Sequence, residues 1–254
     1  MSESAEQLLE QLISAEKADT CGIDSMQTYR VMHEPRFADI LRICRDLVPD
    51  PSARVLDIGR SELTAYLATF YQNIHTLGFD PSADDGGHRE TGNLKVVPHI
   101  TFNLLDASNV ATWPKCGPFD LIVFSEVIEH LHVAPEYVLA FLGSLLTPSG
   151  VLVCTTPNAV GITKRIRMLA GRNPYELLRL YEINPGHIRE YTRDELVKIS
   201  ASVGLDSKSH SYHDWIQRKK GSPVKTVVMQ FLYAYPAFRP FQMFAFVRRE
   251  GMIR

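Results

Sequence analysis

The sequence lacks most features of secreted, membrane-spanning or disordered proteins. Its 254 residues include four cysteines and no CxxC pair, so we expect neither a disulfide framework nor a cysteine-based zinc site, and we expect a reducing compartment. The first residues lack the basic-then-apolar pattern of a secretory signal, and the longest apolar stretch, 227–247, is broken by prolines and polar residues. With 45% hydrophobic and 22% charged residues, the chain is expected to be a cytoplasmic globular protein, either free or at a membrane surface, without a transmembrane segment.

The net charge of −2 conceals a division between two parts of the chain. Residues 1–157 carry 10 basic and 21 acidic side chains, whereas residues 158–254 carry 17 basic and 8 acidic ones. A split of this size predicts that the two parts face different partners.

Short runs rich in valine, leucine and isoleucine alternate with helical patterns along the chain. The predicted strands cover residues 54–58, 74–79, 101–105, 119–124 and 151–155. The predicted helices cover residues 4–16, 36–47, 62–71, 135–146 and 193–203. This alternation predicts an α/β fold, namely a doubly wound, mostly parallel sheet with helices on both faces. Residues 207–212 and 243–248 are predicted to close the sheet as an antiparallel pair.

The same pattern suggests how the chain is organised. We expect an N-terminal helical cap over residues 1–50, a core over 51–157, and the remainder of the sheet over 158–254. The last part contains two inserts, at about 158–185 and 214–239. Inserts beyond the strand ends of a doubly wound sheet usually build the substrate pocket.

Carboxylates occur at the ends of three successive predicted strands. Asp57 and Gly59 end the first strand, Asp80 ends the second and Asp106 ends the third. Ligands of an open α/β sheet bind beyond these ends, and a carboxylate after the second strand can accept both hydroxyls of a ribose. The alternative for Asp80 is a structural turn, since the sequence continues with Pro81 and a serine.

Five segments carry a family resemblance. They read VLDIG, GFD, LLD, FDLIVFSEVIEHL and LLTPSGVLVCTTPN, and in this order and spacing they resemble class I S-adenosylmethionine-dependent methyltransferases over about residues 50–205. The resemblance implies a seven-stranded sheet with a reversed last hairpin, and S-adenosyl-L-methionine as the cofactor. It places Asp57 and Gly59 by the methionine part, Asp80 on the ribose and Asp106 by the adenine.

The glycine-rich loop of that family is reduced here to one glycine. Ser61 and Leu63 stand where the second and third glycines are usual, so cofactor binding could be weakened or lost in a non-catalytic member of the fold. Ser61 is small enough to substitute. Together with Ser125, at the end of the fourth strand, it is assigned to the cofactor site.

A second group of residues follows the fourth strand. If a helix begins at Ser125, Glu126, Glu129 and His130 lie on one helix face, where two carboxylates and an imidazole would suit a divalent metal. The alternative is two acids at a helix N-terminus beside a packed histidine. His187 lies in the loop before a helix whose start is marked by a Thr192–Glu195 capping box.

ExxEH followed by this loop histidine resembles metal-dependent O-methyltransferases. These include small-RNA 3′-terminal 2′-O-methyltransferases and ubiquinone-pathway O-methyltransferases. The resemblance implies that Glu126, Glu129, His130 and His187 hold Mg²⁺, Mn²⁺ or Zn²⁺ at the acceptor hydroxyl. Without a metal, His130 or His187 would act as the catalytic base.

The inserts bear on the acceptor. Residues 161–180 hold five basic side chains and one acidic one, and residues 218–225 add four more basic ones. Such runs can simply be solvated helix faces, but two of them, both in the inserts, favour an anionic acceptor. We favour a hydroxyl of a sugar, glycan or small molecule, including a lipid-linked saccharide. The alternatives are an RNA 3′ end and a non-catalytic binding role. DNA is not expected, and GRSELT does not fit the GxGxxG pattern of dinucleotide oxidoreductases.

Overall fold

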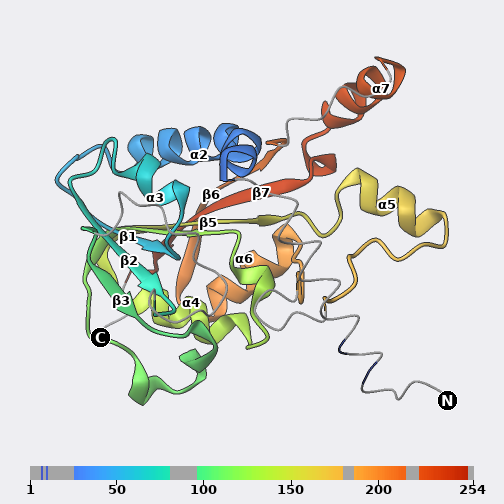
Figure 1. The fold of residues 1–254 in the computed structure, drawn as a ribbon. Helices are drawn as coiled ribbons and strands as arrows, with labels where there is room; N and C mark the ends of the chain where they lie inside the picture. Colours follow the sequence, from blue (N-terminus) through green and yellow to red (C-terminus); the bar gives the residue numbers. More distant parts are fainter. Residues whose placement is uncertain are drawn as a thin grey trace.

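The computed structural model describes residues 26–80, 96–179, 186–215 and 223–250, together with Gln7 and Glu10. It contains a seven-stranded sheet in the order β3-β2-β1-β4-β5-β7-β6 (Figure 1). The strands are β1 (Arg54–Ile58), β2 (Asn73–Gly78), β3 (His99–Thr101), β4 (Phe119–Ser125), β5 (Leu146–Pro157), β6 (Leu205–His213) and β7 (Phe241–Arg248). Neighbouring strands are parallel, except that β7 runs antiparallel to both β5 and β6. The predicted fold class and the closing antiparallel pair are confirmed.

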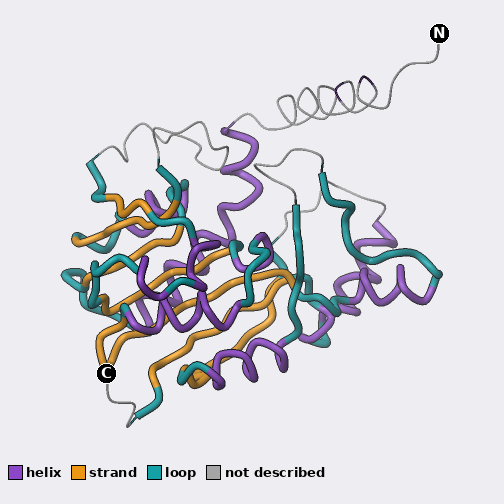
Figure 2. The backbone as a smooth tube through the Cα atoms, turned by 90° about the horizontal axis from the view of Figure 1, so that it is seen from below, coloured by secondary structure: helices purple, strands orange, loops and turns teal. Residues whose placement is uncertain are grey.

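Helices and short 3₁₀ turns connect these strands. The helices are α2 (Met26–Leu47), α3 (Glu62–Leu67), α4 (Pro135–Ser144), α5 (Ile162–Leu169), α6 (Arg193–Ser202) and α7 (Pro223–Tyr233). The 3₁₀ turns are η2 (Leu104–Ser108), η3 (Val110–Thr112), η4 (Ile128–His130) and η5 (Pro236–Phe238). Figure 2 shows helices over the face of the sheet and others beyond the ends of its strands.

Two apolar clusters hold helices on the two faces of the sheet. Successive residues of β1 point to opposite faces, so Val55 packs in the cluster of α2 and α3 whereas Leu56 packs in that of α4 and α6. Both residues are fully buried, as expected for a parallel sheet covered on both sides. This packing fixes the strand ends, where the predicted site residues lie.

Helix α2 is longer than the sequence pattern predicted. It begins at Met26 instead of residue 36 and runs through Pro35. A proline inside a helix costs about 3 kcal/mol because a hydrogen bond is lost and its ring crowds the preceding turn. The later helix residues Phe37, Ile40 and Cys44 are buried against the sheet, and their packing offsets this cost.

Strand β3 is shorter and earlier than predicted. It covers His99–Thr101 instead of residues 101–105, because the Asn103 side chain accepts a hydrogen bond from the Leu105 amide and starts η2. Asn at such a position competes with strand pairing through its own backbone contacts. Helices α5 and α7 lie in the two inserts, for which no helix was predicted. The helix predicted at 4–16 lies outside the described residues, apart from Gln7 and Glu10.

Two further expectations can be compared with the described residues. Cys44, Cys116 and Cys154 are free thiols, and Cys21 lies outside the described ranges. Burial raises the pKa of the Cys154 thiol well above its usual value, so it is not a ready nucleophile. Among the described helices, none has the length and apolar character needed to cross a bilayer.

Candidate active site

The turn after β1 leaves open space beside its backbone. Gly59 has a φ of 96°, in the region that favours glycine, and its amide donates to the Leu77 carbonyl of β2 at 2.7 Å. A Cβ at this position would meet no described atom within 4 Å. The one glycine that survives from the family's loop is therefore the residue that the backbone needs, and a ligand can approach it.

Asp57 and Ser61, both predicted for the cofactor site, are bonded to the start of α3. Asp57 is buried and accepts a hydrogen bond from Thr64 Oγ1 at 2.6 Å, and burial raises its pKa to about 7. Ser61 is the N-cap of α3, with its hydroxyl accepting from the Leu63 amide and its own amide donating to Thr64 Oγ1. These bonds fix the turn, and direct contact of either side chain with a cofactor stays a prediction.

The residues predicted for ribose and adenine are both exposed. Asp80 follows β2 by two residues and borders the undescribed segment 81–95. Asp106 does not end the third strand as predicted, because it lies within η2, beyond the turn that Asn103 starts. Both carboxylates are accessible from solvent, and their contact with a cofactor stays a prediction.

A chain of hydrogen bonds and one ion pair runs from the end of β4 to helix α2. The Thr155 hydroxyl donates to Glu126 Oε1 at 2.9 Å, so Ser125 Oγ, 2.8 Å from Thr155 Oγ1, must be the donor of that pair. Glu126 Oε2 lies 3.4 Å from the Arg36 guanidinium, which is almost fully buried. Burial raises the pKa of Glu126, and Arg36 opposes that rise. Ser125, predicted to contact the cofactor, is the first residue of this chain.

The prediction that a helix begins at Ser125 is wrong. Strand β4 runs to Ser125, Glu126 has a left-handed φ of 53°, and only Ile128–His130 form a single 3₁₀ turn. The Glu126 amide donates to the Thr155 carbonyl at 2.9 Å, which holds this unusual conformation. The predicted sharing of one helix face by Glu126, Glu129 and His130 therefore does not occur.

Glu129 is completely buried, and one of its oxygens has no partner in the described part of the chain. Oε2 accepts a hydrogen bond from Thr156 Oγ1 at 3.1 Å, whereas no described residue hydrogen-bonds to Oε1. Burial and the nearby charge of Glu126 raise the pKa of Glu129 well above its usual value. A cation bound here would relieve both the unsatisfied oxygen and the like-charge repulsion.

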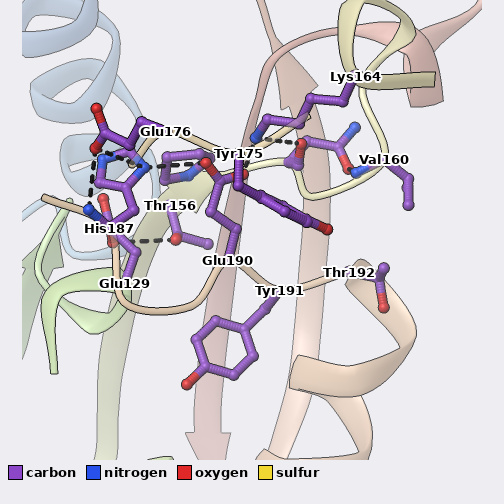
Figure 3. Close-up of polar contacts among 12 residues, drawn as sticks. Glu129, Thr156, Val160, Lys164, Tyr175, Glu176, His187, Glu190, Tyr191 and Thr192 are labelled. Carbon is purple, nitrogen blue, oxygen red and sulfur yellow. Dashed lines mark hydrogen bonds and ion pairs between the residues drawn. The ribbon is translucent and has the colours of Figure 1, made fainter. Parts of the chain in front are cut away.

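The two predicted histidines are each fixed through Nδ1. His130 Nδ1 lies 2.9 Å from the Gly186 carbonyl. His187 Nδ1 lies 3.0 Å from Glu190 Oε1 (Figure 3). Carbonyl and carboxylate oxygens only accept, so each ring donates from Nδ1 and keeps the lone pair on Nε2. Burial and the adjacent His130 lower the pKa of His187 to about 4, so its ring is neutral at pH 7. Metal-binding histidines are commonly oriented by this kind of second hydrogen bond.

Three of the four predicted metal ligands come together. One ligand atom each from Glu129, His130 and His187 lies within 4.8 Å of the other two, and Glu126 is not in this group. The Glu129 carbonyl accepts from the Ile188 amide at 2.8 Å, which ties the His187 loop to η4. A mixed carboxylate and imidazole set is thus assembled from two segments that lie far apart in the sequence.

The loop that carries His187 is also bonded to the segment after β5. Glu176 Oε1 accepts from the His187 amide at 3.0 Å, and Glu190 forms an ion pair with Lys164 of α5 (Figure 3). Gly186 has a φ of 89°, and a Cβ there would lie 2.9 Å from Glu176 Oε1. The predicted basic cluster therefore includes a lysine, Lys164, that already has an acidic partner.

A pocket of about 190 Å³ lies beside His187. It is lined by Pro157 at the end of β5, by Lys164 of α5, and by Tyr233 and Phe238. A larger surface hollow of about 630 Å³, between the turn after η4 and α6, includes none of the predicted site residues. The smaller pocket is therefore the better candidate for the acceptor.

Three residues of the site were not predicted as such. Arg36 reaches Glu126 from a helix ninety positions earlier in the sequence, and no local pattern marks it. Thr156 and Glu190, which hold Glu129 and His187, could have been found only as polar residues adjoining a strand end and a loop histidine. Contacts of this kind depend on the tertiary fold.

A family model described as a methyltransferase domain matches residues 32–210, most of the chain. The chain belongs to this methyltransferase domain family. The match runs from within α2 to within β6 and includes η4 and the His187 loop. No functionally curated protein matches the sequence significantly.

Solved structures support the fold of this methyltransferase. The N-methyltransferase NodS from Bradyrhizobium japonicum WM9, in complex with S-adenosyl-L-homocysteine, aligns over 96% of this chain and 98% of its own, with a TM-score of 0.52 and 15% identity. A 1,6-didemethyltoxoflavin-N1-methyltransferase from Burkholderia thailandensis aligns over 98% of this chain and 92% of its own, with a TM-score of 0.55 and 14% identity. The [4+2]-cyclase SpnF aligns over 85% of this chain and 82% of its own, with a TM-score of 0.52 and 14% identity. The fold alone therefore does not determine the reaction.

Proposed function

We propose that this protein is an S-adenosylmethionine-dependent O-methyltransferase that binds its acceptor hydroxyl at a divalent cation. Glu129, His130 and His187 would hold the cation. The observation that carries the proposal is Glu129 Oε1, which is fully buried beside two imidazoles and has no hydrogen-bond partner among the described residues. Such an oxygen is costly unless a cation or donor satisfies it.

The residues present fit a divalent cation. One carboxylate and two imidazoles suit Mg²⁺, Mn²⁺ or Zn²⁺, and three protein ligands leave coordination positions for the acceptor. The cation would supply a Lewis acid that lowers the pKa of the acceptor hydroxyl. The chain itself keeps both imidazoles in the ligating tautomer through Gly186 and Glu190.

The residues around β1 fit S-adenosylmethionine, which supplies a methyl group on a sulfonium. The open space at Gly59 admits a ligand to the backbone. Exposed Asp80 would accept hydrogen bonds from the ribose hydroxyls, and exposed Asp106 would lie by the adenine. The cap at Ser61 replaces the missing glycines as the element that shapes this turn.

A metal-free reaction with a histidine base is the second candidate. His187 serves this role poorly, because a base whose pKa lies near 4 takes up a hydroxyl proton weakly at pH 7. A neutral imidazole with its lone pair on Nε2 is, in contrast, the form that binds metals. For His187, the site therefore favours cation binding over a role as the base, and His130 stays the candidate base of the metal-free reaction.

For the acceptor, we favour a hydroxyl on a sugar or small molecule. The pocket beside His187 combines Lys164 with the aromatic rings of Tyr233 and Phe238, a lining that suits a ring with polar substituents. An RNA 3′ end stays the alternative, because the exposed basic residues of the first insert could contact phosphates.

Chelation tests the proposed function. Protein would be treated with EDTA, desalted, and assayed with radiolabelled S-adenosylmethionine on monosaccharides, catechols and an RNA oligonucleotide, with and without Mn²⁺. We expect methyl transfer only with Mn²⁺, whereas the affinity for S-adenosylhomocysteine, measured by calorimetry, should be the same in EDTA. Full turnover in EDTA would support the histidine base, and no binding of S-adenosylhomocysteine would support a non-catalytic role.

A further inference from the structure

Exposed apolar side chains are concentrated on two helices and the segment between β5 and α6. Among the described residues, most of the large hydrophobic side chains that are solvent-exposed lie within 166–178 and 227–235. The six most exposed within these ranges are Leu169, Leu177, Phe231, Val227, Leu178 and Tyr235. Leu169 is 89% exposed and Phe231 is 80% exposed. A concentration of this kind marks an interaction surface.

Helix α5 shows the pattern of an interfacial helix. Ile162, Ile166 and Leu169 recur at spacings of four and three, so they share one side of the helix, and no residue of α5 is buried. A helix of eight residues is not stable by propensity alone and needs a packing partner. Within the described residues, α5 packs on η5 and leaves Ile166 and Leu169 of its apolar side exposed.

The charge of this region is predominantly positive. Arg165, Arg167 and Arg172 are exposed on and after α5. The only acidic residue in 158–179 is Glu176, which is already bonded to the His187 amide. Residues 223–249 contain no acidic residue. Apolar side chains flanked by arginines, with one exposed acid that is already engaged by the His187 amide and by Arg179, are complementary to an anionic lipid surface.

Helices α5 and α7 both lie at the same end of the sheet (Figure 1). Both contact η5, and Figure 1 shows both lying beyond the strand ends. The pocket beside His187 is lined by the first residues of α5 and by Tyr233 at the end of α7. The exposed apolar and basic residues therefore surround the same end of the molecule as the candidate active site.

We propose that this docking surface, formed by residues 162–178 and 227–235, binds an anionic lipid bilayer. A second copy of the chain fits less well, because two copies that met through this surface would bring its arginines together. A bilayer in this position would lie beside the pocket of His187. If the proposed function also holds, the acceptor hydroxyl belongs to an amphiphile held in that bilayer.

Vesicle sedimentation tests this proposal. The full-length protein, without cofactor or acceptor, would be mixed with vesicles of phosphatidylcholine alone or with about one-third phosphatidylglycerol. We expect binding to the anionic vesicles that weakens at high salt. The double variant Leu169→Glu/Phe231→Glu should bind at least about tenfold more weakly, because two apolar anchors are lost. Arg167→Glu/Arg172→Glu should lose about fivefold or more for each basic charge removed.

Tyr137→Glu is the matched control, since Tyr137 is an exposed aromatic residue on α4, outside the docking surface. It should bind vesicles as the wild type does. All variants should keep the wild-type circular dichroism spectrum and affinity for S-adenosylhomocysteine, which separates loss of docking from loss of the proposed function. Equal vesicle binding by Leu169→Glu/Phe231→Glu and wild type would overturn the proposal. So would a wild-type dimer that this variant converts to a monomer, with no vesicle binding by either.

Discussion

Replacing Glu129 with glutamine should remove high-affinity Mn²⁺ binding and methyl transfer, whereas Glu126→Gln should bind Mn²⁺ within a few-fold of the wild type. Glutamine keeps the size of Glu129 and can still accept from Thr156 Oγ1. It lacks the charge that a cation requires. Loss of residues that merely orient ligands costs about 10–100-fold in metal affinity, so loss of a charged ligand should cost at least about 100-fold. Titration calorimetry with Mn²⁺ would measure both variants.

The Glu129→Gln protein should also be at least as stable as the wild type above neutral pH. The raised pKa of Glu129 means that the folded state holds its proton more tightly than the unfolded state does, so its contribution to stability is lost as pH rises above about 4.5. A neutral amide mimics the protonated carboxyl and avoids this loss. Comparable losses of Mn²⁺ affinity in Glu126→Gln and Glu129→Gln would instead favour the four-ligand site that the sequence predicted.

Asp80→Ala should lower the affinity for S-adenosylhomocysteine by at least about 100-fold. The substitution removes two hydrogen bonds between a carboxylate and the ribose hydroxyls, each worth about 1.5–3 kcal/mol, and 1.4 kcal/mol is a factor of ten. Because Asp80 is exposed, the free energy of unfolding should change little. Calorimetric titration and thermal unfolding would measure the two effects separately.

Asp80→Asn and Asp106→Ala are the controls for this assignment. Asn keeps one acceptor oxygen without the charge, so we expect an intermediate loss of affinity. Asp106→Ala should have a smaller effect, since Asp106 is assigned to the neighbourhood of the adenine alone. Unchanged affinity in Asp80→Ala would show that Asp80 serves only the turn before Pro81.

The fold was predictable because its signals are local and repeated. Apolar β-rich runs that alternate with helical patterns indicate a parallel sheet even when the tertiary contacts are unknown. Strand β1 agrees with this pattern, because Val55 and Leu56 are both buried, on opposite faces of the sheet. Helix α2 was less predictable. Pro35 is a local signal for a helix end, but burial of later residues such as Phe37 overrides it.

The candidate site was predictable in composition and not in geometry. The spacing of Glu126 and Glu129 suggested one helix face, but the left-handed backbone at Glu126 is held by a bond to Thr155, which belongs to another strand. Glu126 consequently pairs with Arg36, while Glu129 lies with the histidines. Lys164, grouped by sequence with the anion-binding residues, instead pairs with Glu190. Interactions between distant segments decide each of these outcomes.

The most direct test of the cation site is anomalous diffraction from crystals grown with Mn²⁺ and S-adenosylhomocysteine. We expect an anomalous peak about 2.0–2.2 Å from a Glu129 oxygen and from Nε2 of both His130 and His187, with Glu126 still paired to Arg36. The absence of an anomalous peak among these three residues at saturating Mn²⁺ would contradict the cation site.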